Sequence, residues 1–306
     1  MALGAIAMTA PAHRPILAIA LRLAAAALIA AMLTLVKLAG EAGVALPEIL
    51  FWRQCLSIPL LLGWMRLTGN TGLLRTQRLW IHGRRAMLGL TSMSLFLGAA
   101  LFMPLAELTT LTFAGPLFAV ALSALLLKEA VGPWRWGAVA LGFAGVGIVA
   151  QPSGEALPAL GVAMGSLAAM LNGLISVQVR DLGRTEHPLT SVFMFSAFSM
   201  IPLALLLPFF AAPHTPPTYA LLIGTGITGM LAQIGLTSAL RFGTVATVTV
   251  MDYSGLIWST LAGWLVWNHL PPLTTWIGAP LIIAAGLIVV WREHRLAIDR
   301  AKEIAA

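Results

Sequence analysis

The sequence predicts an all-α polytopic membrane protein with ten transmembrane helices, arranged as two five-helix inverted repeats. Two observations support this prediction. Of the 306 residues, 59% are hydrophobic and 9% are charged, whereas a soluble domain carries about 25% charged residues. The apolar residues also gather into two sets of five spans. Because five is odd, the second set crosses the membrane in the opposite direction, as in secondary transporters with two alternating gates.

Each apolar segment has about the 20 residues that a helix needs to cross a bilayer. We expect α-helices, because backbone groups in lipid must find hydrogen-bond partners within their own segment. The first span is too long for the apolar part of a signal peptide, which is about 7–15 residues, so we expect it to be retained. The expected spans are Ile16–Leu38, Glu48–Leu67, Arg85–Leu105, Leu108–Leu127, Pro133–Ala150, Leu160–Val179, Leu189–Phe210, Tyr219–Leu240, Ala246–Val266 and Thr274–Trp291.

The repeats divide the chain into residues 1–152 and 153–306, within one integral membrane unit. Small residues support this division, because two Gly/Ala pairs of the first repeat recur in the second at a constant offset of 141. Such residues allow close helix packing in lipid. The matching pairs are Gly137-Ala138 with Gly278-Ala279, and Ala144-Gly145 with Ala285-Gly286.

The basic residues predict the orientation of the chain. All but two of the 18 Lys and Arg residues fall in loops or at span ends on one side, and the exceptions are Lys37 and Arg53. The positive-inside rule then places both termini in the cytoplasm, in a bacterial-type inner membrane. This orientation explains the net charge of +7 without a nucleic-acid partner.

One stretch of the first repeat carries a family pattern. It has a mid-span proline, Pro116, then Glu129 at the end of that span, and a closing span rich in glycine. With Pro47 before the second span and Arg53 early in it, this pattern resembles the EamA family of the drug/metabolite transporter superfamily. The resemblance covers nearly the whole chain. It implies a ten-helix carrier with inverted repeats and a central cavity.

The second repeat departs from this family pattern. Gly255 stands where a proline is usual, Asn268 stands where a glutamate is usual, and Asp252 interrupts an apolar span. Glu129, which we read as a cytoplasmic helix-end residue, therefore has no acidic counterpart in the second repeat. The connection after the second span and the pair Arg53-Gln54 are similar to the aromatic amino-acid exporter branch.

Asp252 is the acidic residue that lies well inside a span. An ionised group at the bilayer centre costs about 2.5–3.5 kcal/mol on insertion scales, so we expect it in a cavity or beside a partner. It could contact an ammonium group of the substrate or a proton. Alternatively, it could form a structural pair with a hydroxyl or amide of a neighbouring helix.

Three residues at the outer end of the spans are candidates for an outer gate. Arg53 could hold a substrate carboxylate, extend toward the interface or fix a helix end. Lys37 has the same alternatives, with the interface favoured. Glu107 lies at the outer turn, where an ion pair with Lys37 or Arg53 would latch the gate.

Further candidates for substrate binding are polar or aromatic residues inside spans. For the amides the alternative is a hydrogen bond between helices, and for the aromatic residues it is ordinary packing. The candidates are Asn172, Gln233, Phe96, Phe113, Tyr253 and Trp258.

The sequence therefore predicts a secondary transporter that exports small amphipathic metabolites, above all aromatic or other apolar amino acids, by alternating access. It contains no enzyme motif, and we expect no cofactor and no metal; the single cysteine, Cys55, excludes an internal disulfide. The expected partners are a small-molecule substrate and the lipid bilayer, and proton coupling stays open. Alternatives are a multidrug or organic-cation exporter using Asp252, and a lipid flippase or membrane assembly subunit.

Overall fold

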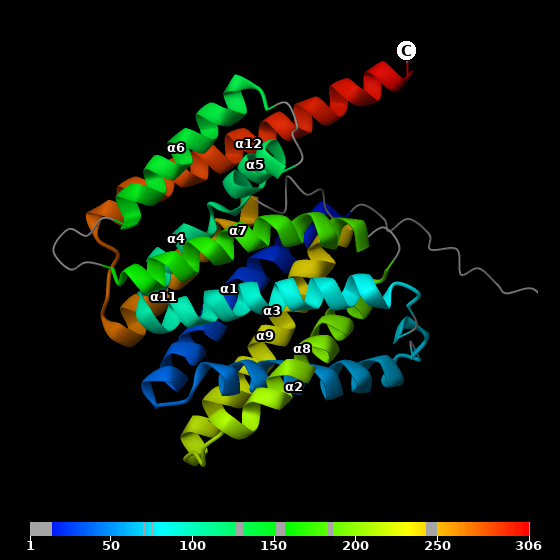
Figure 1. Cartoon of the computed structure of the whole chain (residues 1–306), viewed down its shortest axis with the longest axis vertical. Helices are drawn as coiled ribbons and strands as arrows, with labels where there is room; N and C mark the ends of the chain where they lie inside the picture. Colours follow the sequence, from blue (N-terminus) through cyan, green and yellow to red (C-terminus); the bar gives the residue numbers. More distant parts are fainter. Residues whose placement is uncertain are drawn as a thin grey trace, which may run out of the picture.

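The computed structural model describes residues 14–69, 71–74, 76–126, 131–150, 157–182, 186–242 and 250–305. Over these ranges the chain is helical and forms no strand, so the predicted all-α class is confirmed (Figure 1). A short 3-10 turn, η1, covers Thr71–Leu74. The α-helices are α1 Pro15–Glu41, α2 Leu46–Leu67, α3 Leu79–Phe102, α4 Leu105–Thr112, α5 Gly115–Leu126, α6 Pro133–Ala150, α7 Ala159–Leu182, α8 Pro188–Phe210, α9 Pro216–Phe242, α11 Ser254–Trp267 and α12 Leu273–Ala305.

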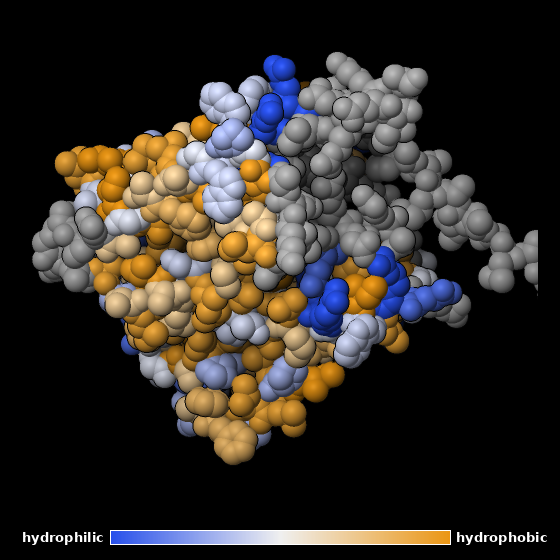
Figure 2. Space-filling view, turned by 45° about the horizontal axis from the view of Figure 1, so that its top comes forward, coloured by the Kyte–Doolittle hydropathy of each residue, from blue (hydrophilic) through white to orange (hydrophobic). Residues whose placement is uncertain are grey.

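Six segments within the described residues are long and apolar enough to cross a membrane. The surface around them is apolar as well: Leu205 is 70% exposed, Leu265 68% and Ile257 67%. Figure 2 shows hydrophobic residues over much of the visible face, with strongly hydrophilic residues gathered toward one side. Such a surface matches lipid, because a soluble monomer rarely exposes contiguous apolar patches of this extent. The six segments are Ile16–Glu41, Leu79–Phe102, Leu105–Leu122, Leu189–Phe210, Pro216–Ala239 and Leu273–Arg292.

Several helices begin at a proline. Pro47 lies in the first turn of α2, and α6, α8 and α9 start at Pro133, Pro188 and Pro216. Proline suits this position because its fixed φ is helical and the first N–H groups have no partner within the helix. At α8 the ring of His187 adds a cap, since its Nδ1 accepts the Leu189 N–H at 3.2 Å.

Helices far apart in sequence pack along one another. α1 lies along α9, α3 along α7 and α6 along α12, while α2 contacts both α8 and α9. We call the side of the bundle at which α1 begins and α2 ends the basic side, because Arg66, Arg78 and Arg84 lie there. The connection between α2 and α3 on this side is at the right of Figure 1, and the α1–α2 turn on the opposite side is at the lower left.

The seam between α6 and α12 is closed by glycines. A Cβ at Gly145 would lie 2.9 Å from the Gly278 carbonyl oxygen, and a Cβ at Gly278 would lie 2.7 Å from that of Gly145. The two backbones are therefore in direct contact. The predicted role of these small residues in close packing is confirmed for this pair, although Gly137 has no such neighbour within 4 Å.

Two expected spans are interrupted, which corrects the prediction of continuous helices. The expected span Leu108–Leu127 is split into α4 and α5 by a turn at Phe113 and Ala114. The cause is Pro116, which lacks an N–H for the helix ladder and whose ring clashes with the carbonyl four residues earlier. The expected span Ala246–Val266 begins partly outside the described residues. Its described part is helical over 250–252, turns at Tyr253 and continues as α11.

Candidate functional site

The two interruptions lie against each other in the interior. The rings of Phe113 and Tyr253, one from each turn, pack edge to face with centroids 4.9 Å apart. Nearby, the hydroxyls of Thr109 on α4 and Ser259 on α11 are hydrogen-bonded at 2.7 Å. The broken helices therefore cross at their breaks, where an aromatic pair adjoins a polar contact.

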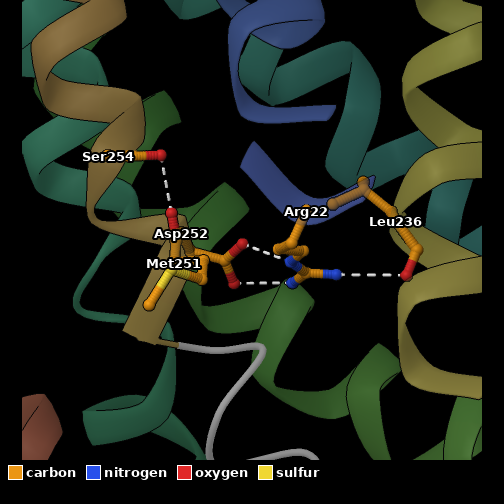
Figure 3. A network of polar contacts seen from close by, with 5 residues as sticks. All are labelled: Arg22, Leu236, Met251, Asp252 and Ser254. Atoms are coloured by element: carbon orange, nitrogen blue, oxygen red, sulfur yellow. Dashed lines mark hydrogen bonds and ion pairs between the residues drawn. The ribbon is translucent and has the colours of Figure 1, made fainter. Parts of the chain in front are cut away.

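Asp252 is held by Arg22 of α1 (Figure 3). Both carboxylate oxygens accept from the guanidinium, Nε donating to Oδ1 and Nη2 donating to Oδ2 at 2.6 Å. The third nitrogen, Nη1, donates to the Leu236 carbonyl of α9 at 3.2 Å. Because Arg22 thus joins three helices, it forms the centre of what we call the basic-side latch.

The electrostatic setting of this latch suits an ion pair. The side chain of Arg22 is 14% exposed and that of Asp252 is 33% exposed, so the pair is partly buried but keeps some contact with solvent. Asp252 lies just before the N-terminus of α11, where the helix dipole stabilises a negative charge. Arg22 is about 10 Å into α1 from the basic side at 1.5 Å per residue, so it is an interior residue rather than a flanking one.

On the opposite side, α1, α4 and α11 meet through several weaker contacts. Lys37 Nζ donates to the Met103 carbonyl at 3.2 Å and lies 5.1 Å from the centre of the Trp267 ring. Trp267 Nε1 in turn donates to Glu41 at 2.8 Å. We call Lys37, Trp267 and Glu41, together with Glu107 and His269, the opposite-side cluster.

Glu107 is buried in the first turn of α4, at 1% exposure. Its hydrogen-bond partner is His269, at 3.4 Å from Nε2 to Oε1. The expected pairing with Lys37 or Arg53 is not formed, because Lys37 is engaged by Met103 and Trp267 and Arg53 points into the interior. His269 lies two residues after the end of α11, and no sequence pattern places it beside Glu107.

Arg53 is buried between helices, at 7% exposure. Its Nε lies 3.3 Å from Met32 Sδ, and Nη1 lies 3.4 Å from Gln54 Oε1. The alternative in which it extends toward the interface is therefore wrong. Arg85 of α3 is buried to the same extent, and the two guanidinium groups lie within electrostatic range of each other.

The other predicted residues are spread over the bundle. Asn172 is exposed and accepts from Ser92 Oγ at 3.1 Å, which joins α7 to α3. Gln233 and Phe96 are partly buried on α9 and α3, and Trp258 on α11 is 38% exposed. Glu129 lies outside the described residues.

The sequence does not single out three residues of these contacts: Arg22, Arg85 and His269. It places both arginines at span ends, because the positive-inside rule treats an arginine near a span end as a flanking charge. α3 begins at Leu79, two turns before Arg85, which places this charge inside the bundle. The signal that could have found it is the unbroken helical pattern on both sides of the arginine pair 84–85.

The described residues hold no group of three or more His, Cys, Asp or Glu side chains able to bind a metal ion. Apolar membrane-length helices, two of them broken and crossing in the interior, are typical of helical membrane transporters.

The chain belongs to the EamA-like transporter family, whose model matches residues 16–151 and 159–291. A solved crystal structure shares the fold with a TM-score of 0.58, at 20% identity, over 89% of this chain and 98% of the other.

Relatives of known name are transporters of small molecules. A riboflavin transporter of Vibrio cholerae is 30% identical, over 81% of this chain and 84% of its own. A pseudopaline exporter of Pseudomonas aeruginosa is 27% identical, over 80% and 87%. An S-adenosylmethionine uptake transporter of Rickettsia prowazekii is 26% identical, over 81% and 84%. These findings identify the chain as a membrane transporter.

Proposed function

We propose that this protein is a secondary carrier that moves small amphipathic metabolites by alternating access between two five-helix repeats. The observation that carries the proposal is the crossing of two broken helices at matching points. Phe113 and Asp252 are 139 positions apart, and each lies at the interruption of its helix. Interruptions at corresponding positions of two halves point to the binding site of a transporter.

Helix packing supports the two repeats. Exchanging each helix of the first set for its counterpart converts the α1–α9 contact into α7–α3, and α2–α9 into α8–α3. The α2–α8 and α6–α12 contacts convert into themselves. All of these contacts are present. The family model also matches two successive stretches, 16–151 and 159–291, which favours the division into residues 1–152 and 153–306.

The mechanism then uses the two closures in turn. The basic-side latch and the opposite-side cluster are both engaged in this structure, so we propose that it represents a state closed on both sides. Rocking of the repeats would separate Arg22 from Asp252 in one direction, and Trp267 from Lys37 in the other. The charge pattern favours the basic side as the cytoplasmic one, with both termini there in an inner membrane.

The transported molecule is proposed to be an aromatic or other apolar amino acid, moved outward. The Phe113–Tyr253 pair supports a flat apolar group, because aromatic rings pack edge to face with a third ring. Relatives named for riboflavin, pseudopaline and S-adenosylmethionine widen the set to be tested. The organic-cation alternative loses its main observation, because Asp252 is already neutralised by Arg22.

Uptake into proteoliposomes tests the proposal. The purified full-length chain is reconstituted, and influx of labelled phenylalanine, tryptophan and riboflavin is followed with and without a pH gradient. We expect saturable flux of at least one compound above empty vesicles. Absence of saturable flux for every compound would contradict the carrier function, and a response to the gradient would establish proton coupling.

A further inference from the structure

The interior of the bundle holds a group of buried polar side chains between α2, α3 and α8, away from the basic-side latch. Arg53 and Arg85 are each 7% exposed, Gln54 and Ser196 are 1% exposed, and Ser199 is fully buried. We call this group the arginine chamber. Arg53 lies about 10 Å inside α2 from the opposite side and Arg85 about 9 Å inside α3 from the basic side. The two residues therefore lie at similar depths from opposite sides of the bundle.

The nitrogens of the arginine chamber have few acceptors. Arg85 Nε and Nη1 have no hydrogen-bond partner, and its guanidinium lies 4.5 Å from the centre of the Phe195 ring. Gln54 Nε2 is also without an acceptor, since Gln54 uses its oxygen to accept from Ser196 at 3.3 Å. Arg53 reaches only a thioether and the same amide oxygen. Several strong hydrogen-bond donors are thus buried without an acceptor.

The acids of the described residues do not supply the missing countercharge. Neither Arg53 nor Arg85 forms an ion pair within 4.0 Å in the described part of the chain, where each acidic side chain that the structure describes has a partner elsewhere. Those pairings are Asp252 with Arg22, Glu48 with His214, Glu107 with His269, Glu186 with Thr76 and Glu41 with Trp267.

Two buried like charges without a counterion are costly, because the loss of hydration is not offset by attraction. In membrane proteins, ionisable groups that persist at such depth mark the path of a substrate or ion. A structural tether would give the guanidinium N–H groups acceptors within the protein. The Arg85 guanidinium instead lies over the Phe195 ring, and its Nε and Nη1 have no hydrogen-bond acceptor.

We propose that Arg53 and Arg85 together bind an oxyanion, a carboxylate or a phosphate, of the transported molecule, with Gln54 Nε2 as a neutral donor. The two arginines come from different helices and carry two charges, which fits an anion bridged between them. Gly229 on α9 makes room for this arrangement, because a Cβ there would lie 3.0 Å from Arg53 Nε. This inference rests on the proposed carrier function and adds the charge class of the substrate.

Matched probes in proteoliposomes test the oxyanion requirement. Tryptophan is compared with tryptamine, which lacks only the carboxylate, and riboflavin 5′-phosphate with riboflavin. The oxyanion member of at least one pair is expected to be taken up about 10- to 100-fold better, the range of a charge-assisted hydrogen bond. Equal or better uptake of the member without the oxyanion would overturn the inference while leaving the carrier function standing. If no probe shows saturable uptake, the carrier function itself fails, and the oxyanion site with it.

Neutral substitutions assign the preference to the two arginines. Arg53→Gln and Arg85→Gln should each remove the oxyanion preference. The matched controls are Arg66→Gln on α2 and Arg84→Gln on α3, both exposed, which should retain it. An unchanged preference in the Arg85→Gln protein would contradict the assignment.

Thermal unfolding in detergent separates binding from a structural role. If Arg85 is an uncompensated cation, Arg85→Gln should raise the unfolding temperature of the substrate-free protein, by at least about 2 °C. A lower unfolding temperature would show that the arginine supports the fold, and would overturn the inference even if transport were lost.

Discussion

The two sides of the bundle are closed in different ways. On the basic side, one bidentate ion pair between Arg22 and Asp252 joins α1 to the turn before α11. On the opposite side, the same two parts of the chain are joined by Lys37 and Trp267, with no charge pair between them. A single strong contact is lost at once when one partner changes, whereas a set of weak contacts is lost in parts. The two closures should therefore respond unequally to single substitutions.

Both closures depend on helices that hold the two repeats together, and the close contact between α6 and α12 is the candidate for this role. Gly145→Leu would force a side chain into Ile282 and into the Gly278 carbonyl, 2.8 and 2.9 Å from the new Cβ. We expect this change to destabilise the protein by about 1–3 kcal/mol or more and to abolish transport in either direction. The yield of monodisperse protein in detergent and its unfolding temperature measure the effect.

Gly147→Leu is the control for the seam, because Gly147 is on the same helix, is exposed and would have no neighbour within 4 Å of an added Cβ. It should fold and transport as the natural chain does. Equal loss in both variants would show that α6 tolerates no large residue anywhere, and the special role of the glycine contact would be wrong.

The basic-side latch should show the larger single-residue effect on transport. Asp252→Asn leaves Arg22 charged and without its partner, so we expect a loss of about 10- to 100-fold in the transport rate, matching a charged hydrogen-bond pair. Initial rates in proteoliposomes measure it. The double variant Arg22→Gln with Asp252→Asn should recover unfolding temperature relative to Asp252→Asn, since no isolated charge remains. If single and double variants are equally unstable, the two residues are not coupled.

The opposite-side cluster should be less sensitive. Glu107→Gln removes the negative charge beside His269 but keeps a hydrogen-bonding group, and Lys37 and Trp267 still hold the side closed. Because His269 is 43% exposed, solvent screens this contact and it should contribute no more than about 1 kcal/mol. We therefore expect transport to change by less than about fivefold. A loss as large as that of Asp252→Asn would make the two sides equivalent and would remove the asymmetry.

The sequence predicts the positions of the helices well, but it predicts poorly where the charged side chains lie and which residues they contact. The expected span Pro133–Ala150 coincides with α6, because its apolar run begins at a proline and ends before a polar connection. Pro116 and Asp252 mark the two breaks in the sequence, but each lies in a span that is apolar on both sides, so hydropathy alone predicts a continuous helix there. The Arg22–Asp252 pair joins residues 230 positions apart, which only tertiary packing can bring together.

One departure noted in the sequence finds its explanation in the backbone. Asn268, which stands where the family pattern has a glutamate, ends α11 with a φ of 52°. Asparagine tolerates this left-handed conformation better than most residues, and the turn bonds His269 N–H to the Gly263 carbonyl at 3.1 Å. The residue thus turns the chain so that His269 reaches Glu107, a local requirement that a comparison of the repeats alone does not show.

The smallest expected effect comes from a change within the opposite-side cluster that keeps its ring. Trp267→Phe removes the hydrogen bond to Glu41, while an aromatic face remains for Lys37. Because the lost bond is exposed and a hydrogen bond contributes about 0.5–1.5 kcal/mol net, transport should fall less than about threefold. Trp267→Ala, which removes the ring as well, should cost more, and initial rates of the two variants give the share of the cation–ring contact. If Phe and Ala are equivalent at this position, the ring contact with Lys37 contributes nothing to closure, and the opposite side depends on the other contacts of the cluster.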